Sequence, residues 1–116
     1  MIKTADILIG EAQKHIDCVD AEAARKICNE NPDTLILDVR ETASADQSKL
    51  EHSVNVPRGL IEMRLPKEYP DPDTPIITHC AGGGRASLAA FTLKQMGYRK
   101  VYAITAPYDA IKAAFA

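Results

Sequence analysis

The chain has 116 residues, of which 46% are hydrophobic and 26% charged, the size and balance of one ordinary globular domain. Its formal net charge of −2 offers no basic footprint for nucleic acid, and no apolar run approaches the roughly 20 residues that span a bilayer. We therefore expect a single domain over residues 1–116, in the cytoplasm, without a nucleic-acid or membrane partner.

Residues 1–16 are predicted to form a leading amphipathic helix, because apolar residues recur there at helical spacing. The segment lacks the basic start and cleavage site of a signal peptide. A short extended piece at 18–19 precedes a helix over 21–28, with Asp20 as its N-cap. The apolar run at 35–39 is typical of a strand buried on both faces, as in a parallel sheet.

The middle of the chain is more polar and more broken. We expect a short surface helix within 41–50, a brief strand at 54–56 and one or two helical turns over 60–65. Prolines then recur from Pro66 to Pro75, which predicts an irregular connection.

The last third of the chain alternates buried strands with helices. The predicted elements are a strand at 76–80, a glycine loop at 81–84, a helix at 85–96 capped by Gly97, a strand at 101–104 and a helix at 108–115. Strands that alternate with helices indicate an α/β fold in three layers, with a mostly parallel sheet of about five strands flanked by helices on both faces.

Three cysteines are present, namely Cys18, Cys28 and Cys80. Their odd number and irregular spacing fit neither a disulfide framework nor a zinc site, so we expect free thiols and no metal. Each is either a small buried hydrophobe or a reactive group.

Cys80 lies where ligands bind in parallel sheets, at the carboxyl end of a predicted strand. The glycines at 82–84 let backbone N–H groups point inward, and the following helix start adds partial positive charge. A thiol in this place ionises more readily, and its thiolate can attack a sulfane sulfur. The same amides can hold the resulting anionic persulfide. The alternative is a structural turn around a buried cysteine; the order of strand, loop, Arg85 and helix favours the functional interpretation.

Four segments, in order, resemble motifs of the single-domain rhodanese family. They are Leu37-Asp38-Val39-Arg40-Glu41, Val54-Asn55-Val56-Pro57-Arg58-Gly59, the loop and helix start from Cys80 to Ala90, and Met96-Gly97-Tyr98 with Val101-Tyr102. The resemblance implies the rhodanese fold and a reaction without cofactor or metal. It implies that Cys80 takes sulfur from a donor such as thiosulfate and passes it to cyanide or a thiol. The resemblance also implies that the substrate-binding loop consists of Ala81, Gly82, Gly83, Gly84 and Arg85.

The chain departs from the family pattern in two segments that border the site in the family fold. Residues 48–52 replace a Gly-His-Ile-Pro-Gly stretch, and Ala106-Pro107-Tyr108 stands where relatives have a Gly-Gly pair and a tryptophan. The loop also has no basic residue before Arg85. A neutral loop predicts weak thiosulfate turnover or a carrier protein as sulfur donor, so small-molecule and protein donors both stay open as partners.

Five other polar residues lie near the predicted site. Arg85 either binds an anionic substrate or braces the loop, and Arg58 either points at the site or forms a surface salt bridge. Asp38 and Arg40 are expected to organise the end of the sheet, since a buried carboxylate needs a partner. His79 precedes the nucleophile, but strand neighbours point to opposite faces, so we expect a packed residue and not a base.

Two other functions compete with sulfur transfer. Phosphatases and arsenate reductases of the related fold place five residues between cysteine and arginine, whereas four separate Cys80 from Arg85. The shorter loop suits one sulfur atom and is too tight for a tetrahedral oxyanion. A non-catalytic module that binds a partner or a persulfidated protein is the second rival.

Overall fold

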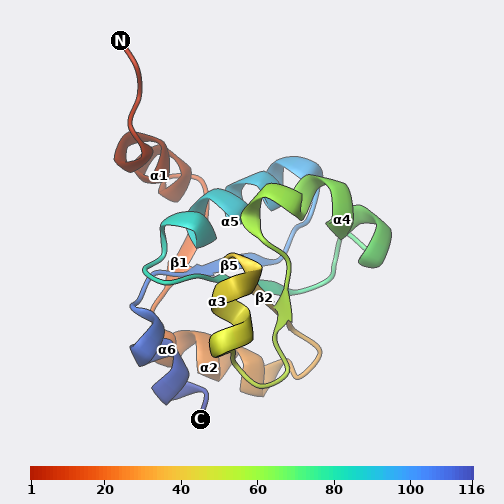
Figure 1. The fold of residues 1–116 in the computed structure, drawn as a ribbon. Coiled ribbons are helices and arrows are strands. Elements are labelled where there is room, and N and C mark those ends of the chain that lie inside the picture. Colours follow the sequence, from red (N-terminus) through yellow and green to blue (C-terminus); the bar gives the residue numbers. More distant parts are fainter.

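The computed structural model describes residues 1–116 and contains one five-stranded parallel sheet in the order β1-β5-β4-β2-β3 (Figure 1). The strands are β1 (Asp17–Val19), β2 (Leu35–Asp38), β3 (Val54–Asn55), β4 (Ile76–His79) and β5 (Val101–Ile104). The helices are α1 (Ala5–Gln13), α2 (Ala21–Glu30), α3 (Thr42–Gln47), the 3-10 helix η1 (Arg58–Leu60), α4 (Ile61–Glu68), α5 (Gly84–Met96) and α6 (Tyr108–Ala114). None of the helices combines the length and apolar character of a membrane-spanning segment. The predicted α/β fold is confirmed.

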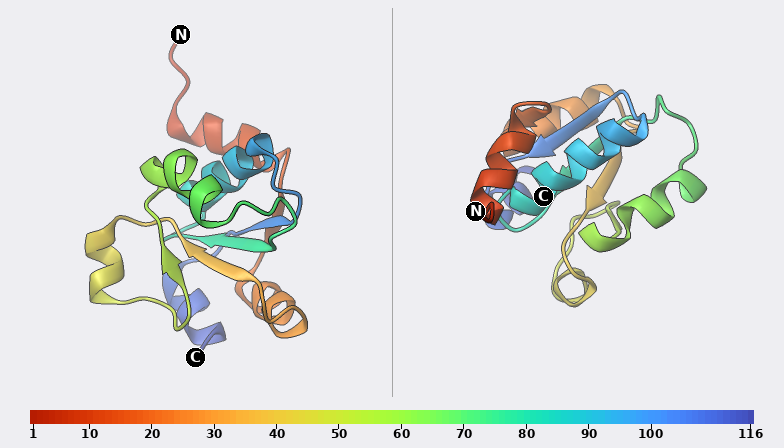
Figure 2. Two further views of the ribbon diagram at one scale, coloured as in Figure 1. Left: turned by 90° about the vertical axis from the view of Figure 1, so that its right-hand side faces the viewer. Right: turned by 90° about the horizontal axis from the view of Figure 1, so that it is seen from above.

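Helices cover both faces of the sheet. Helices α1, α4 and α5 lie on one face, and α2 and α6 lie on the other (Figure 2). Successive residues of β2 alternate between the two layers, since Leu35 and Leu37 join the first core and Ile36 joins the second. Burial on both sides explains why this strand is an unbroken apolar run.

The leading helix is shorter than predicted. The hydroxyl of Thr4 accepts from the amide of Ile7 and starts α1 at Ala5, and the helix ends at Gln13 instead of Ile16. The chain must turn there because Asp17 already pairs with β5. At the start of α2, Asp20 is the N-cap that the sequence predicted.

The prediction that the irregular connection begins at Pro66 was wrong, because α4 continues through this residue to Glu68. A proline inside a helix removes one backbone hydrogen bond. Burial of Ile61 and Leu65 against the core holds the helix in place, and the Tyr69 amide still donates to the Leu65 carbonyl. Tertiary packing thus outweighs the local signal.

Candidate active site at the carboxyl end of the sheet

The thiol of Cys80 lies directly after β4, beneath the loop that leads into α5. Its Sγ accepts hydrogen bonds from the amides of Gly83, at 3.1 Å, and Ala86, at 3.4 Å. The residue is only 2% exposed. Amide donors at a helix start stabilise negative charge, so the sulfur is held where an anion is favoured.

The second half of the loop, Gly83 and Gly84, is packed tightly, and we call it the clamped half. Gly83 has a φ of 102°, and a Cβ there would lie 2.9 Å from Cα of Thr105. A Cβ on Gly84 would lie 2.8 Å from Cδ1 of Ile9 in α1. Glycine is therefore required at Gly83 by both backbone conformation and close approach.

The first half of the loop, Ala81 and Gly82, is exposed, and we call it the open half. A Cβ on Gly82 would have no other atom within 4 Å. The hydrogen bond from the Tyr108 amide to the Ala81 carbonyl, at 3.0 Å, ties this half to the start of α6. The second half of the loop thus holds the sulfur, while the first half is less constrained by packing.

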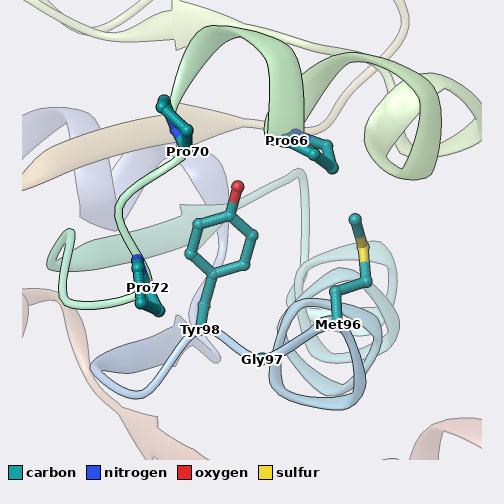
Figure 3. Close-up of a pocket in the computed structure, with 6 residues that line it drawn as sticks. All are labelled: Pro66, Pro70, Pro72, Met96, Gly97 and Tyr98. Carbon is teal, nitrogen blue, oxygen red and sulfur yellow. The ribbon is translucent and has the colours of Figure 1, made fainter.

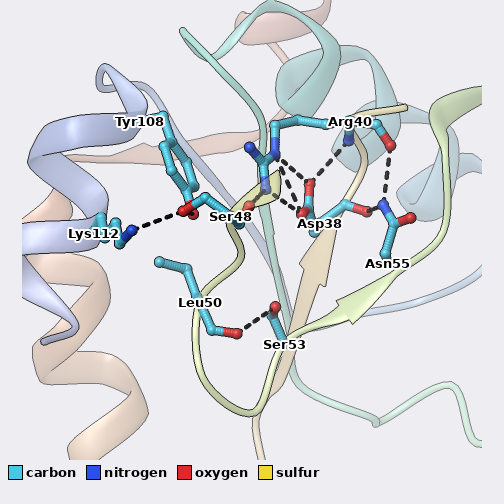
Figure 4. A network of polar contacts seen from close by, with 8 residues as sticks. All are labelled: Asp38, Arg40, Ser48, Leu50, Ser53, Asn55, Tyr108 and Lys112. Atoms are coloured by element: carbon cyan, nitrogen blue, oxygen red, sulfur yellow. Dashed lines mark hydrogen bonds and ion pairs between the residues drawn. The ribbon is translucent and has the colours of Figure 1, made fainter. Parts of the chain in front are cut away.

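A buried ion pair organises the neighbouring end of β2 (Figure 4). Arg40 donates to both carboxylate oxygens of Asp38, Nε at 3.0 Å and Nη2 at 2.8 Å. The hydrogen bond to Asp38 raises the pKa of Arg40. The amide side chain of Asn55 donates to the carbonyls of both residues, at 2.9 and 3.0 Å. The buried carboxylate of Asp38, which the sequence predicted to need a partner, is therefore paired with Arg40. The pair stabilises this end of the sheet.

The two segments that depart from the family pattern contact each other. The hydroxyl groups of Ser48 and Tyr108 form a hydrogen bond at 3.0 Å. Lys112 donates to the same serine oxygen at 2.8 Å (Figure 4). The Arg40 guanidinium donates to the Ser48 carbonyl and lies 4.1 Å from the Tyr108 ring centre. His52 has a φ of 65°, so the turn keeps a left-handed residue where the family pattern has glycine.

His79 is fully buried, and neither of its ring nitrogens has a hydrogen-bond partner. Its ring stacks against Tyr108, with ring centres 6.1 Å apart. Burial lowers the pKa of His79; the charge of Arg40 acts in the same direction, and that of Asp38 opposes it. A neutral, packed imidazole on the face away from the thiol has the geometry of a core residue and not of a general base.

The two candidate arginines have different surroundings. Arg85 is half-buried at the start of α5, and its side chain forms no hydrogen bond or ion pair within the chain. Arg58 donates to Thr92, at 2.9 Å, and pairs with Glu62, at 3.3 Å. These are the contacts of a surface ion pair, whereas the guanidinium of Arg85 is free to meet an anion.

The other two cysteines lie apart from Cys80, since Cys28 packs against the core on the other face of the sheet and Cys18 lies in β1. Cys18 pairs in register with Ala103, and Ala103 with Thr78, which puts Cys18 two strands over and two residues short of Cys80. That offset is about 12 Å between Cα atoms, beyond the ~7 Å limit for a disulfide. Desolvation raises the pKa of both Cys18 and Cys28. We therefore assign neither thiol a role in the reaction.

A surface cavity of about 160 Å³ lies outside the Cys80 loop, and Figure 3 shows the residues that line it. It is lined by Pro66, Pro70, Pro72, Met96, Gly97 and Tyr98. Gly97 caps the C-terminus of α5, and a 13-residue helix is about 20 Å long, so the cavity and Cys80 are at opposite ends of α5. The Tyr98 hydroxyl donates to the Tyr69 carbonyl at 2.6 Å, which fixes the aromatic wall.

Sequence reasoning missed three residues that hold the loop. Ser87 donates its hydroxyl to the Gly83 carbonyl at 2.6 Å, and the four-residue spacing of a serine in a helix is a signal that could have predicted this contact. Thr105 lies behind Gly83, and Gln13 donates to Ser87 at 3.1 Å. No local pattern indicates either of these contacts.

Comparison with known proteins agrees with this geometry. The chain matches the rhodanese-like domain family over residues 20–114. It is 29% identical over 83 residues to a sulfurtransferase of Allochromatium vinosum, covering 72% of this chain and 76% of that protein. It is 30% identical over 83 residues to a putative sulfur carrier protein of Bacillus subtilis, covering 72% of this chain but only 44% of that protein. The chain thus spans less than half of this second relative.

Solved structures share the fold over most of the chain. A Rhodopseudomonas palustris protein of unknown function, described as a possible tyrosine phosphatase, superposes with a TM-score of 0.84 at 25% identity, covering 98% of this chain and 92% of its own. The homodimeric polysulfide-sulfur transferase of Wolinella succinogenes superposes with a TM-score of 0.71 at 27% identity, covering 89% and 77%. Because the family match includes the whole loop from Cys80 to Arg85, and strands β2 to β5, the chain belongs to the rhodanese-like family.

Proposed function

We propose that the chain is a rhodanese-type sulfurtransferase in which Cys80 carries sulfane sulfur as a persulfide. The observation that carries the proposal is the position of the Cys80 sulfur, 3.1 Å from the Gly83 amide and 3.4 Å from the Ala86 amide at the start of α5. These donors favour the thiolate that attacks and the persulfide anion that results. The sulfurtransferase relative supports the same reaction class.

The reaction has two half-reactions and balances without a cofactor. The Cys80 thiolate attacks the outer sulfur of a donor such as thiosulfate, the donor's S–S bond breaks, and sulfite leaves with the electron pair. The enzyme then holds a Cys80 persulfide. Cyanide or a thiolate acceptor attacks the terminal sulfur, and the bonding pair returns to Cys80. Ping-pong kinetics follow from this order of steps, and the unpaired Arg85 is the group we assign to the anionic donor.

A persulfide carrier served by a protein donor is the second candidate. The putative sulfur carrier of Bacillus subtilis supports it. The sulfur is 2% exposed, and the loop is neutral before Arg85, which suits a donor that presents its sulfur on a flexible chain better than a free dianion. In either case Cys80 is the residue loaded.

Phosphatase chemistry is the third possibility, since one structural neighbour is described as a possible tyrosine phosphatase. The four residues between Cys80 and Arg85 make a cradle smaller than the five-residue loop of such enzymes. We expect no hydrolysis of p-nitrophenyl phosphate under conditions in which Cys80 is loaded with sulfur.

The deciding experiment measures intact mass after incubation with thiosulfate, with Cys80→Ser as the variant and Cys18→Ser as the matched control. We expect the native chain and the control to gain one sulfur mass that cyanide or a thiol removes, while Cys80→Ser gains none. Loading of Cys80→Ser would refute the mechanism. A native chain that takes no sulfur from thiosulfate but takes it from a persulfidated cysteine protein would select the carrier.

A further inference from the structure

Helix α1 lies before the residues that match the family, yet it contacts the clamped half of the loop. Ile9 covers the backbone of Gly84 so closely that a Cβ there would lie 2.8 Å from its Cδ1. One turn further along α1, Gln13 reaches Ser87 in α5. The leading helix therefore contacts the active-site loop and the first turn of the helix that follows it.

A chain of hydrogen bonds leads from this helix to the nucleophile. The Gln13 side-chain nitrogen donates to Ser87 Oγ at 3.1 Å, and that hydroxyl donates to the Gly83 carbonyl at 2.6 Å. The Gly83 amide donates to Cys80 Sγ at 3.1 Å. A serine hydroxyl has one proton, so donation to Gly83 requires that Gln13 be the donor to Ser87.

The orientation of Gly83 decides whether its amide points at the Cys80 sulfur. Its amide and its carbonyl belong to adjacent peptide planes that rotate about a glycine, the residue with the widest backbone freedom. Thr105 closes off the space behind its Cα, and Ser87 fixes its carbonyl with both the amide, at 2.9 Å, and the hydroxyl. With the carbonyl and the Cα held, the direction of the N–H toward Cys80 is held as well.

We propose that Gln13 and Ser87 are positioning residues, through which α1 aims the Gly83 amide at the Cys80 sulfur. The inference rests on the proposed function for its consequence in catalysis, since the amide so aimed stabilises the thiolate and the persulfide. Ser87 is fully buried and Gln13 lies at the surface, so the two can be changed with different risks to folding.

The test follows alkylation of Cys80 by iodoacetamide against pH in the full chain, by the mass of the Cys80 peptide. The alkaline plateau reports access, and the pH of half-maximal rate reports how well the site stabilises the thiolate. For Ser87→Ala we expect this midpoint to rise by about 0.5 pH units, because the Gly83 carbonyl then keeps only the Ser87 backbone amide and the Gly83 N–H is held less firmly toward the sulfur. Gln13→Glu should do the same, since a carboxylate accepts the Ser87 proton and withdraws it from Gly83.

Controls separate positioning from general loss of structure. Gln13→Ala should move the midpoint less than Gln13→Glu, because Ser87 can then still donate to Gly83. Lys3→Ala removes an exposed ion pair between a residue that precedes α1 and Glu11 of α1, and it should leave the midpoint unchanged. In the double variant Gln13→Glu with Ser87→Ala, the shift should equal that of Ser87→Ala alone, since both act through one hydroxyl.

Sulfur transfer gives the second readout. We expect kcat to fall about three- to tenfold in Ser87→Ala and Gln13→Glu, with KM for the donor unchanged. Alkylation midpoints equal to that of the native chain in both variants would overturn the positioning role, whether or not the chain transfers sulfur. Absence of transfer in the native chain with shifted midpoints would instead count against the proposed function and leave the positioning role supported.

Discussion

The two halves of the active-site loop consist of equally small residues but differ in their surroundings. Gly83 and Gly84 are pressed against Thr105 and Ile9, while Gly82 has no other atom near the place of a Cβ. The clamped half supplies an amide to the sulfur, and the open half is exposed. The difference shows that neighbouring glycines need not have the same role: Gly83 places a fixed amide donor at the sulfur, whereas packing does not require glycine at Gly82.

The largest effect is expected for Gly83→Ala. The new Cβ would lie 2.9 Å from the backbone of Thr105, and the φ of 102° is unfavourable for alanine. Relief of the clash would therefore require the backbone to shift. We expect a loss of about 2–4 kcal/mol in the free energy of unfolding and at least a tenfold slower gain of sulfur mass. Urea unfolding and intact-mass kinetics measure the two. A loss below about 1 kcal/mol would mean that the clamped half is not fixed by Thr105.

A pH effect tests the packing of Tyr108, whose amide donates to the Ala81 carbonyl of the open half and whose ring stacks against His79. The pKa of His79 lies below its ordinary value of 6.5 because of burial, so the unfolded chain binds a proton that the folded chain does not. Stability contributed by the neutral ring is complete above pH 6.5 and is lost as the pH falls from there, by at most about 2 kcal/mol at pH 5.

Urea unfolding of His79→Phe at several pH values checks this. The variant keeps an aromatic ring against Tyr108 and should lose that part of the pH dependence, while His52→Gln, at an exposed histidine, should retain it. An unchanged slope in His79→Phe would show that the ring titrates alike in both states.

A smaller effect is expected for Gly84→Ala, because the obstructing atom is the flexible end of Ile9. The clash and the gain in helix propensity should nearly cancel, within about 1 kcal/mol. In an Ile9→Val background, which lacks the obstructing Cδ1, the same change should stabilise the chain by about 0.5–1 kcal/mol. Thermal unfolding of the four proteins in this cycle would contradict the contact if the two backgrounds gave the same result.

The smallest effect is expected for Gly82→Ala, which adds a methyl group to open space. Stability should change by no more than about 0.5 kcal/mol, and sulfur loading should stay within about twofold. Both are measured as for Gly83→Ala. An effect as large as that at Gly83 would break the distinction between the two halves.

The sequence predicted most of the fold because its signals are local. Alternating strands and helices, the Asp20 cap and the Gly97 cap all agree with the structure. The wrong prediction at Pro66 shows that local signals do not account for tertiary packing. Burial of Ile61 and Leu65 lets α4 continue through this proline. Similarly, only pairing of Asp17 with β5 explains why the leading helix ends at Gln13.

The sequence by itself determined that Cys80 follows a strand, precedes a glycine turn and stands at the start of a helix, because neighbours along the chain define those features. Only the tertiary structure decided which glycine is clamped and what holds it. Gln13 and Ser87 are 74 positions apart, and Ser48 and Tyr108 are 60 apart. Such contacts depend on how the helices pack on the sheet, and no local periodicity or turn preference encodes them.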